Sequence, residues 1–473
     1  MEKTGKSLVV VSNRLPAVIE QVDGQWRIGA AAGGLVTALA PLMRGRGGLW
    51  IGWPGAAEEA PLTELLAAFN QEQGYRLHPV SLTQQEVDCY YHGFSNEALW
   101  PLFHDLLGHC SFSRNDWECY CRVNQHFAEV TAAVAGPQAP IWVHDYQLAL
   151  VGEELRHLGS RQPLAYFLHI PFPGPDLFRR HPWKTEFVHA LLAYDLLGFQ
   201  TLLDRRNFVN TAVSLLPELQ IVSRQRLITI LRYQDRLVKV GHFPISIDFA
   251  EFADLAKSRE VAEAAWYLHE NLLSRQLVLG IDRLDYTKGI PERFLAFERA
   301  LEKHPDLIRK VSLLQVVVPS RTEVPEYQKL KEILDSHAGR INGRFAEGGW
   351  VPIHYVFRSL DRVQLLAHYR AAEIALVTPL RDGMNLVAKE YCASSVDNNG
   401  VLILSEFAGA AEQLATGAIL VNPYDIDSTA DAIYQAFSME PAERARRMTR
   451  LRAEIRRNDV HRWLRWFIDS LEA

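Results

Sequence analysis

The sequence predicts an α/β protein built from doubly wound, largely parallel sheets with helices on both faces. Short apolar runs of the kind found in buried parallel strands alternate with longer amphipathic segments almost throughout the chain. At 473 residues, the chain is too long for a single hydrophobic core. We therefore expect two such domains facing each other across a cleft, with ligands bound at the carboxyl ends of the strands.

The expected strands are the runs rich in Val, Ile and Leu at residues 7–12, 49–52, 141–144, 164–169, 238–244, 277–281, 312–318, 374–377, 401–404 and 418–421. Amphipathic segments between them, such as residues 147–158 and 290–303, are expected to be helices. Another helix should begin after Thr83, because Thr83 and Glu86 have the spacing of a capping box.

A domain boundary is expected near residues 244–248, where a strand ends. A long helical stretch, residues 249–273, follows, and the strand–helix alternation resumes at Leu277. The final segment, residues 441–473, is charged and helical with a break near Asn458.

Composition excludes several classes of protein. With 50 basic and 56 acidic side chains, a net charge of −6 and no polybasic run, nucleic-acid binding is not expected. The first apolar run, Leu8–Val11, is too short for a signal peptide or a membrane span, and no later stretch reaches 18 uncharged apolar residues. We therefore expect a cytoplasmic protein that does not contact a membrane.

The five cysteines are odd in number and scattered, which favours a reducing compartment and buried free thiols. Cys119 and Cys121, with Cys110 and His109 nearby, lack the paired spacing of a zinc site. No metal site is predicted.

Polar residues follow several predicted strands of the first half. Gly33 and Gly34 come after the first strand and open a helical pattern, where backbone N–H groups can approach a phosphate. An ordinary strand-to-helix turn remains the alternative, because the dinucleotide-binding G-x-G-x-x-G pattern is missing. Asp145 and His169 each lie at the carboxyl end of a strand, where open α/β sheets bind ligands; a purely structural hydrogen bond is the alternative for His169.

The second half shows a similar pattern. Arg283 and Lys288 lie five residues apart in a loop after a strand and suit a diphosphate, unless this is simply a solvated charged loop. Residues 377–390 read as a strand, a glycine-containing turn and a helix that begins near Asn385. The helix N-terminus suits phosphate, and Glu390, about one turn along, suits sugar hydroxyls.

Taken in order, these segments resemble the trehalose-6-phosphate synthases, a family of retaining glycosyltransferases with the GT-B architecture of two Rossmann-like domains. The resemblance runs from residue 9 to the C-terminal helix. The strings that carry it include Gly48-Leu-Trp-Ile-Gly-Trp53, Trp142-Val-His-Asp-Tyr146, His169-Ile-Pro-Phe-Pro173, Arg283-Leu-Asp-Tyr-Thr-Lys-Gly289 and Arg381-Asp-Gly-Met-Asn-Leu-Val387.

The resemblance implies transfer of glucose from a nucleotide-glucose, most often UDP-glucose, to glucose 6-phosphate with retention of configuration and without a metal or other cofactor. It implies an acceptor-binding domain over residues 1–246 and a nucleotide-sugar-binding domain over residues 247–456, with residues 457–473 packing back on the first. It implies small molecules as partners and leaves oligomeric state, a homo-oligomer included, and nucleotide preference open.

By match to the family's motifs, the acceptor phosphate would be held by Arg14, Tyr91, Trp100 and Arg321, and the acceptor sugar by Asp145. The donor diphosphate would be bound by Gly34, Arg283, Lys288 and the backbone of Leu386 and Val387, and the ribose by Glu390. The transferred glucose would be oriented by His169, Asp382 and the neighbouring backbone of Gly383, Met384 and Asn385. The residues expected at the reacting atoms are His169, Asp145, Arg283, Lys288 and Asp382.

The sequence departs from the family pattern at Ala32, Gly174 and Ser246, where Ser, Ser or Thr, and Gly are usual. None of these changes removes a predicted ligand group. Two alternatives keep the fold: an enzyme with another acceptor, such as a glucosylglycerol-phosphate synthase or a pseudo-glycosyltransferase that joins cyclitols, and a non-catalytic sugar-phosphate sensor. The sensor predicts loss of donor-site residues, yet Arg283 and Glu390 are both present.

Overall fold

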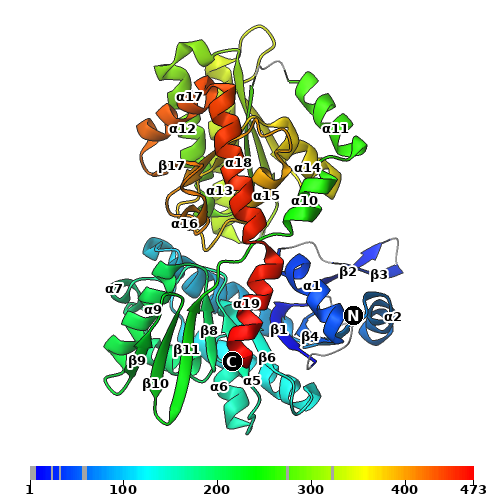
Figure 1. Ribbon diagram of the computed structural model, residues 1–473, viewed down its shortest axis with the longest axis vertical. Coiled ribbons are helices and arrows are strands. Elements are labelled where there is room, and N and C mark those ends of the chain that lie inside the picture. The colour runs from blue at the N-terminus through cyan, green and yellow to red at the C-terminus, as the bar shows by residue number, and fades with distance from the viewer. Residues whose placement is uncertain (1–6, 23–24, 31–33, 56–60, 273–275, 321–323) are drawn as a thin grey trace. The chain divides into compact units, whose positions relative to one another are not determined.

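The computed structural model describes residues 7–22, 25–30, 34–55, 61–272, 276–320 and 324–473 (Figure 1). The chain forms two compact units. The N-terminal unit comprises Met1–Ile245 together with Trp463–Ala473, and the C-terminal unit comprises Ser246–Arg462. Each unit is an α/β structure built on its own sheet, so the predicted fold class of doubly wound domains is confirmed.

The sheet of the N-terminal unit has the strand order β5-β4-β1-β6-β7-β8-β11-β10-β9. Its strands are β1 (Val9–Arg14), β4 (Leu49–Trp53), β5 (Arg76–Pro79), β6 (Ile141–His144), β7 (Leu164–Phe167), β8 (Leu196–Phe199), β9 (Gln220–Arg224), β10 (Ile228–Tyr233) and β11 (Arg236–His242). The pairings are parallel except for those that β10 makes with β9 and β11. The order reverses between β1 and β6, so the carboxyl ends of these two strands flank the position where such sheets bind ligands.

The helices of this unit that precede β6 are α1 (Gly34–Arg46), α2 (Leu62–Gln73), α3 (Gln84–Glu86), the π-helix η1 (Val87–Leu99), α4 (Trp100–Phe103), η2 (Leu107–His109) and α5 (Arg114–Val134). They are followed by η3 (Tyr146–Leu148), α6 (Val151–His157), α7 (Pro175–Phe178), α8 (Lys184–Leu192) and α9 (Leu202–Leu215). The predicted capping box is present: the Thr83 N–H donates to Glu86 Oε2 at 2.8 Å, and the Glu86 N–H donates to Thr83 Oγ1 at 3.3 Å.

The last helix, α19 (Val460–Glu472), packs an apolar face on this sheet. Phe467 stacks on Trp142 of β6 with ring centroids 4.2 Å apart, and Trp463 Nε1 donates to the Phe243 carbonyl at 3.1 Å. A side chain at Gly198 of β8 would collide with Phe467, so glycine there lets the helix approach the strand closely.

The C-terminal unit has an all-parallel sheet in the order β14-β13-β12-β15-β16-β17. Its strands are β12 (Gln276–Arg283), β13 (Val311–Val318), β14 (Ile353–Phe357), β15 (Ile374–Val377), β16 (Val401–Ser405) and β17 (Ile419–Val421). One face packs against α12 (Ile290–Lys303), α13 (Pro325–Phe345) and α17 (Ile426–Ser438). Contacts to the sheet also come from α14 (Arg362–Ala371), α15 (Leu386–Ser394) and α18 (Pro441–Arg457).

The helical stretch expected over residues 249–273 forms two helices, α10 (Phe249–Leu255) and α11 (Arg259–Glu270), and its last residue lies outside the described residues. The break has a local cause. The Ser258 hydroxyl accepts the Val261 N–H at 3.4 Å and so caps a new helix.

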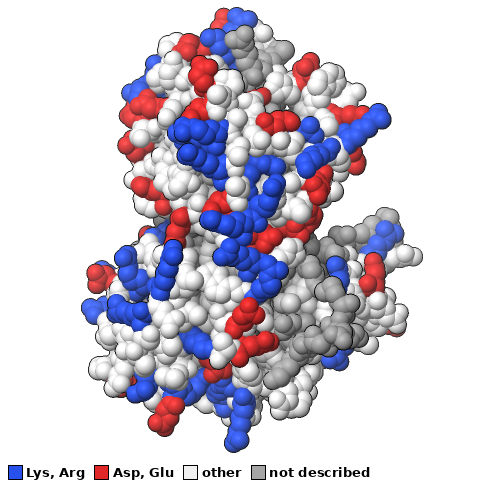
Figure 2. Space-filling view, in the orientation of Figure 1, with Lys and Arg blue, Asp and Glu red and all other residues white. Residues whose placement is uncertain are grey.

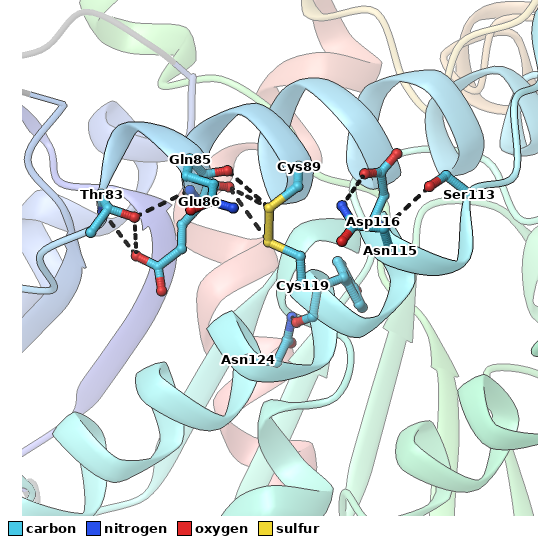
Figure 3. The surroundings of a disulfide bond; sticks show 10 residues. Thr83, Gln85, Glu86, Cys89, Ser113, Asn115, Asp116, Cys119 and Asn124 are labelled. Atoms are coloured by element: carbon cyan, nitrogen blue, oxygen red, sulfur yellow. Dashed lines mark hydrogen bonds between the residues drawn. A yellow bond between two sulfur atoms is a disulfide. The ribbon is translucent and has the colours of Figure 1, made fainter.

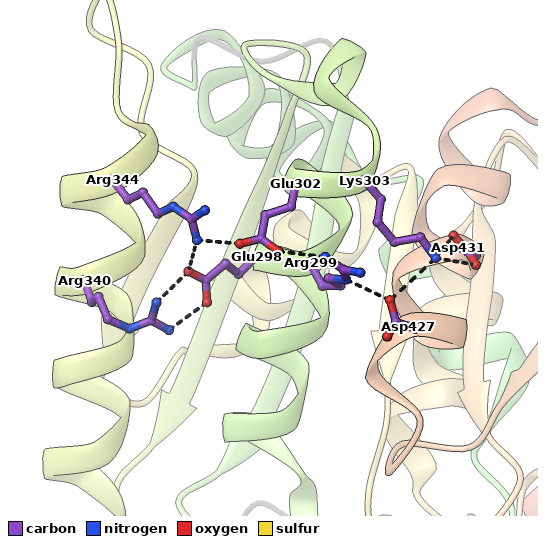
Figure 4. A network of polar contacts seen from close by, with 8 residues as sticks. All are labelled: Glu298, Arg299, Glu302, Lys303, Arg340, Arg344, Asp427 and Asp431. Carbon is purple, nitrogen blue, oxygen red and sulfur yellow. Dashed lines mark hydrogen bonds and ion pairs between the residues drawn. The ribbon is translucent and has the colours of Figure 1, made fainter.

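Ion pairs connect the helices on one face of the C-terminal unit (Figure 4). Arg340 of α13 donates two hydrogen bonds to Glu298 of α12, at 2.6 and 2.7 Å, and its hydrogen bond lowers the pKa of that carboxyl. On the other side of α12, Arg299 donates to Asp427 of α17 at 2.7 Å. These pairs connect α12 to its neighbours on both sides, although exposed ion pairs of this kind contribute little to stability.

Basic side chains gather along α18 (Figure 2). Arg452 of this helix donates to the carbonyls of Cys392 and Ser395, at 2.9 and 3.1 Å. These carbonyls lie at the C-terminal end of α15, where a cation is electrostatically favourable. Helix α18 therefore helps to fix α15.

The expectation of free thiols is wrong for two of the five cysteines. Cys89 of η1 and Cys119 of α5 form a disulfide, 30 residues apart in sequence (Figure 3). Cys110, Cys121 and Cys392 are free. The spacing of the cysteines gave no signal, because the pair meets only when η1 packs along α5.

Candidate active site

The predicted site residues of the N-terminal unit lie at the carboxyl ends of β1, β6 and β7 and on η1. Arg14 ends β1, and its guanidinium lies 4.3 Å from the ring centroid of Trp53, which ends the neighbouring strand β4. The Trp53 ring is in turn 6.3 Å from the Tyr91 ring on η1. A Cβ at Gly55 would collide with Nη1 of Arg14, so glycine makes room for the guanidinium. The structure thus brings both Arg14 and Tyr91 close to the ring of Trp53.

The π-helix η1 is anchored to two strand ends. Tyr90 donates through Oη to Oδ1 of Asn13, the neighbour of Arg14, at 2.9 Å. Tyr146, which follows β6, donates through Oη to Asn96 Oδ1 at 3.0 Å. Trp100 begins α4 directly after η1, is buried, and packs its ring 5.7 Å from that of Tyr146. Tyr91 and Trp100 therefore belong to one rigid segment; π-helical turns are uncommon and frequently lie at functional sites.

Asp145 directly follows β6 in an unusual backbone conformation, with φ of 74° and ψ of 167°. Its N–H donates to the Phe167 carbonyl at 2.8 Å, and its Oδ1 accepts the His169 N–H at 3.2 Å. The two predicted residues are therefore in direct contact. Such backbone angles cost about 1–3 kcal/mol in a residue other than glycine and cluster at functional sites.

The ring of His169 is joined to a second histidine. Nδ1 of His144, the last residue of β6, lies 3.1 Å from Nε2 of His169. Burial lowers the pKa of His169 to about 3 and that of His144 well below its ordinary value. Both rings are therefore neutral near pH 7.

For two further predicted site residues, Gly34 and Arg321, the structure gives little information. Gly34 is the first residue of α1, as expected for a helix N-terminus, but the helix follows the hairpin formed by β2 (Ala17–Val22) and β3 (Gln25–Ala30) and not the first strand. Arg321 lies outside the described residues.

In the C-terminal unit, Lys288 and Asp382 form the centre of the candidate site. Lys288 ends the short 3₁₀ turn η4 (Tyr286–Lys288) after β12, and Asp382 follows β15. Lys288 Nζ donates to Asp382 Oδ2 at 2.5 Å, with the side chains 11% and 14% exposed. Asn385 Nδ2 donates to the same oxygen at 3.2 Å. Arg283, more exposed, instead contacts Asp285 Oδ2 at 3.2 Å.

A buried arginine forms hydrogen bonds that hold these loops in place. Arg293 of α12 donates to Asp282 Oδ2 at 2.5 Å, to Gln315 Oε1 at 2.9 Å and to Thr378 Oγ1 at 3.1 Å. It also donates to the Lys288 carbonyl at 3.3 Å. One side chain therefore joins β12, β13, the end of β15 and the turn that presents Lys288.

Helix α15 begins beside this ion pair. Its N-cap, Asn385, has a left-handed φ of 68° and its side chain makes no capping hydrogen bond. Leu386 and Val387 form the first turn, whose N–H groups have no acceptor within the helix. The preceding Gly383 and Met384 are buried, and the Met384 carbonyl accepts the Ala410 N–H at 2.8 Å.

Glu390 lies one turn into α15. Its Oε2 accepts a hydrogen bond from Tyr369 Oη at 2.7 Å. Burial raises the pKa of Glu390, against the opposing effect of the Tyr369 hydrogen bond. The preceding residue, Lys389, donates to Gln413 Oε1 at 2.7 Å and attaches the helix to its neighbour α16 (Ala411–Leu414).

Together, the C-terminal residues place a lysine, an amide and a helix N-terminus around one position, an arrangement that stabilises negative charge on a phosphate. Among the described residues, no group of three or more His, Cys, Asp or Glu side chains is arranged to hold a metal ion. Within the same residues, no helix is long and apolar enough to cross a membrane.

The interpretation of the sequence assigned no role to several residues that the structure brings into these sites. Trp53, His144 and Arg293 are the main examples. His144 ends a predicted strand and Trp53 directly follows one, and those positions were the signal available. Arg293 lies in the middle of a helix and offered none.

The chain resembles known proteins in sequence and in structure. The chain matches the sequence profile of Glycosyltransferase family 20 over residues 6–473. It is 43% identical to the trehalose-6-phosphate synthase of Mycolicibacterium vanbaalenii, covering 99% of this chain and 96% of that protein. It is 44% identical to that of Mycolicibacterium smegmatis, covering 98% and 92%.

Solved structures agree. A UDP-forming α,α-trehalose-phosphate synthase from Burkholderia xenovorans in complex with glucose 6-phosphate has a TM-score of 0.87 at 37% identity, covering 99% of this chain and 100% of that one. An E. coli structure of the same kind, bound with UDP-2-fluoro glucose, also has a TM-score of 0.87 at 37% identity, covering 98% and 99%. The resemblance found in the sequence motifs is therefore confirmed, and the chain belongs to glycosyltransferase family 20.

Proposed function

We propose that this chain transfers glucose from a nucleotide-glucose, most readily UDP-glucose, to glucose 6-phosphate, forming α,α-trehalose 6-phosphate with retention of configuration. The observation that carries the proposal is the Lys288–Asp382 pair at the uncapped start of α15. It offers cationic and backbone donors for a diphosphate next to a carboxylate for a sugar. The similarity to synthases solved with glucose 6-phosphate and with a UDP-sugar supports the same substrates.

Most of the acceptor-binding residues belong to the first domain, residues 1–246 with 457–473. Arg14, Tyr91 and Trp100, together with Arg321, would hold the phosphate of glucose 6-phosphate, and Asp145 a sugar hydroxyl. The cation–π contact with Trp53 supports this role, because it holds the Arg14 guanidinium in place before any ligand binds.

Most of the donor-binding residues lie within residues 247–456. Breaking the bond between the anomeric carbon and the phosphate oxygen leaves negative charge on the diphosphate. Arg283, Lys288 and the first-turn N–H groups of α15 would stabilise that charge. Gly34 would contribute backbone N–H groups to the same diphosphate, and Glu390 would bind the ribose.

The reacting sugar needs orientation as well as charge stabilisation. His169 and Asp382 would hold hydroxyl groups of the transferred glucose, with the backbone from Gly383 to Asn385 beside them. Attack on the same face as the departing phosphate gives retention, and a phosphate oxygen takes the proton of the attacking hydroxyl. This scheme uses no cofactor. The cytoplasmic location and any homo-oligomer stay predictions, which cell fractionation and sedimentation would check.

The test is a product assay with purified protein, glucose 6-phosphate and, separately, UDP-, GDP- and ADP-glucose. We expect nucleotide release matched by a non-reducing disaccharide phosphate. Nucleotide release without that product, or turnover only with glycerol phosphate or a cyclitol phosphate as acceptor, would overturn the proposed acceptor. No turnover with any donor would favour a sugar-phosphate sensor.

Two variants separate the half-sites. Arg14→Ala should raise KM for glucose 6-phosphate and Lys288→Ala should lower kcat/KM for the donor, each by about 10- to 100-fold for a lost charge-assisted hydrogen bond. Arg114→Ala is a matched control, because that side chain is 85% exposed and its ion pair is with Glu118 on its own helix. An unchanged acceptor KM in Arg14→Ala would refute the acceptor assignment.

A further inference from the structure

His144 is a buried histidine beside the candidate site with no assigned role. Its side chain ends β6, the residue is 1% exposed, and its ring lies 4.6 Å from that of Trp142 on the same strand. Trp142 is held in turn by the stacked Phe467 ring of α19. The imidazole of His144 is therefore fixed on one side before any ligand binds.

The contact between His144 Nδ1 and His169 Nε2 requires that one nitrogen carry a proton and the other a lone pair, because both rings are neutral. If His169 Nε2 were the donor, His144 would carry its proton on Nε2. That nitrogen is buried and has no hydrogen-bond partner among the described residues. A buried N–H without an acceptor is rarer than an acceptor without a donor. The arrangement therefore favours His144 Nδ1–H as the donor.

This assignment determines the state of His169. With Nε2 accepting from His144, the neutral His169 ring carries its proton on Nδ1. The side chain of His169 stays partly exposed, and its Nδ1 has no hydrogen-bond partner within the described part of the chain. The His169 N–H is meanwhile held by Asp145 Oδ1 at 3.2 Å. Backbone and ring are thus both oriented by consecutive residues at the end of β6.

We propose that His144 is a positioning residue, which fixes the tautomer and orientation of His169 so that Nδ1–H of His169 is presented as a hydrogen-bond donor to a hydroxyl group of a sugar substrate. The proposal rests on the proposed function for the identity of the sugar, but the tautomer it assigns does not depend on turnover. His144 would act like the hydrogen-bond partner of a catalytic or metal-binding imidazole. Such a partner determines which ring nitrogen of the imidazole faces the ligand.

The first experiment measures the tautomer directly. In protein labelled with ¹⁵N-histidine, the His169 signals are assigned by their loss in His169→Gln. We expect a protonated Nδ1 and an unprotonated Nε2 in the ligand-free protein, and a shift of the proton toward Nε2 in His144→Phe, which keeps a ring but cannot donate. A protonated Nε2 in the unsubstituted protein would overturn the proposal.

The second experiment measures turnover. His144→Phe should lower kcat by about tenfold or more, the effect of one lost buried hydrogen bond, while KM for glucose 6-phosphate stays unchanged. His144→Asn, whose amide can donate from nearly the position of Nδ1, should recover most of kcat. His157→Phe, at an exposed histidine of α6, is the matched control.

The outcomes separate the two levels of inference. Equal kcat and equal His169 signals in His144→Phe and the unsubstituted protein would refute the positioning role. Absence of glucose transfer by the unsubstituted protein, with the His169 tautomer as assigned, would refute the proposed function and leave the pairing of the histidines intact. If His144→Phe does not fold, the comparison of His144→Asn with a His144→Leu variant by the same two measurements decides.

Discussion

We expect His181 to make the N-terminal unit sensitive to acid. It lies between α7 and α8, is 0% exposed, and accepts the Trp183 N–H on Nδ1 at 3.0 Å. Its ring packs among aromatic side chains, including those of Phe178 and Phe187. Burial, helped by the nearby charge of Lys184, lowers its pKa from 6.5 to about 3.

The sign and size of the effect follow from this shift. Between the two pKa values the unfolded chain binds a proton that the folded protein does not, so stability is fully present above the unfolded pKa and is lost as pH falls. Each pH unit in that window is worth about 1.36 kcal/mol. Lowering the pH from 7 to 5 should therefore remove about 2 kcal/mol of unfolding free energy through His181 alone.

The comparison that isolates this contribution is His181→Phe, since phenylalanine keeps the aromatic packing and cannot be protonated. Urea unfolding at pH 7 and pH 5 would be followed by hydrogen exchange of peptides from residues 175–192, which report on the N-terminal unit. The unsubstituted protein should lose about 2 kcal/mol more than the variant over this range, because other buried histidines contribute equally to both. Equal losses, or an NMR titration of His181 near its ordinary pKa, would refute the reasoning.

Three further predictions concern other parts of the fold. The disulfide predicts three reactive thiols in denatured protein without reductant and five after reduction; five before reduction would contradict it. Cys89→Ser should lower the stability of the N-terminal unit by about 3–4 kcal/mol, because the disulfide closes a loop of 30 residues. Arg293→Met should lower the free energy of unfolding in urea by about 3–5 kcal/mol, because it leaves the Asp282 carboxylate buried and unpaired. Adding Asp282→Asn should restore part of this loss. A double variant that is no more stable than Arg293→Met would exclude this cause. Gly55→Ala places a methyl group against the Arg14 guanidinium. This substitution should raise KM for glucose 6-phosphate and leave KM for the donor unchanged. An unchanged KM for glucose 6-phosphate would show that Arg14 can move freely.

Strands that are buried on both faces could be predicted from continuous apolar runs in the sequence alone. Ile141–His144 and Ile374–Val377 match their predicted ranges, because a continuous apolar run is required where helices cover both faces of a parallel sheet. The strands that were not predicted lack this feature. β9 alternates between exposed and half-buried residues, and β14 is half-buried along most of its length. The polar residues of β9, such as Ser223 and Arg224, are also typical of a loop until the neighbouring strands are known.

The candidate site was predictable to the level of individual strand ends, and the pairings between them were not. Lys288 and Asp382 lie 94 residues apart, and nothing in either motif indicates that they form an ion pair. The same holds for Tyr90 and Asn13, which are 77 residues apart. Topology explains why the strand-end rule nevertheless works: parallel strands bring all their carboxyl ends to one edge of the sheet, whichever residues meet there.

Backbone strain at Asp145 helps to explain how the end of β6 brings two consecutive residues to His169. Glycine would adopt the observed angles at lower cost, but glycine would lack the carboxylate that Asp145 provides. That carboxylate accepts the His169 N–H, while the preceding His144 contacts the His169 ring. Turning the chain through φ of 74° at residue 145 lets two consecutive residues hold the same neighbour from backbone and ring, although side chains of consecutive strand residues point to opposite faces. The strained turn and the paired histidines are therefore one device, which orients His169 from β6.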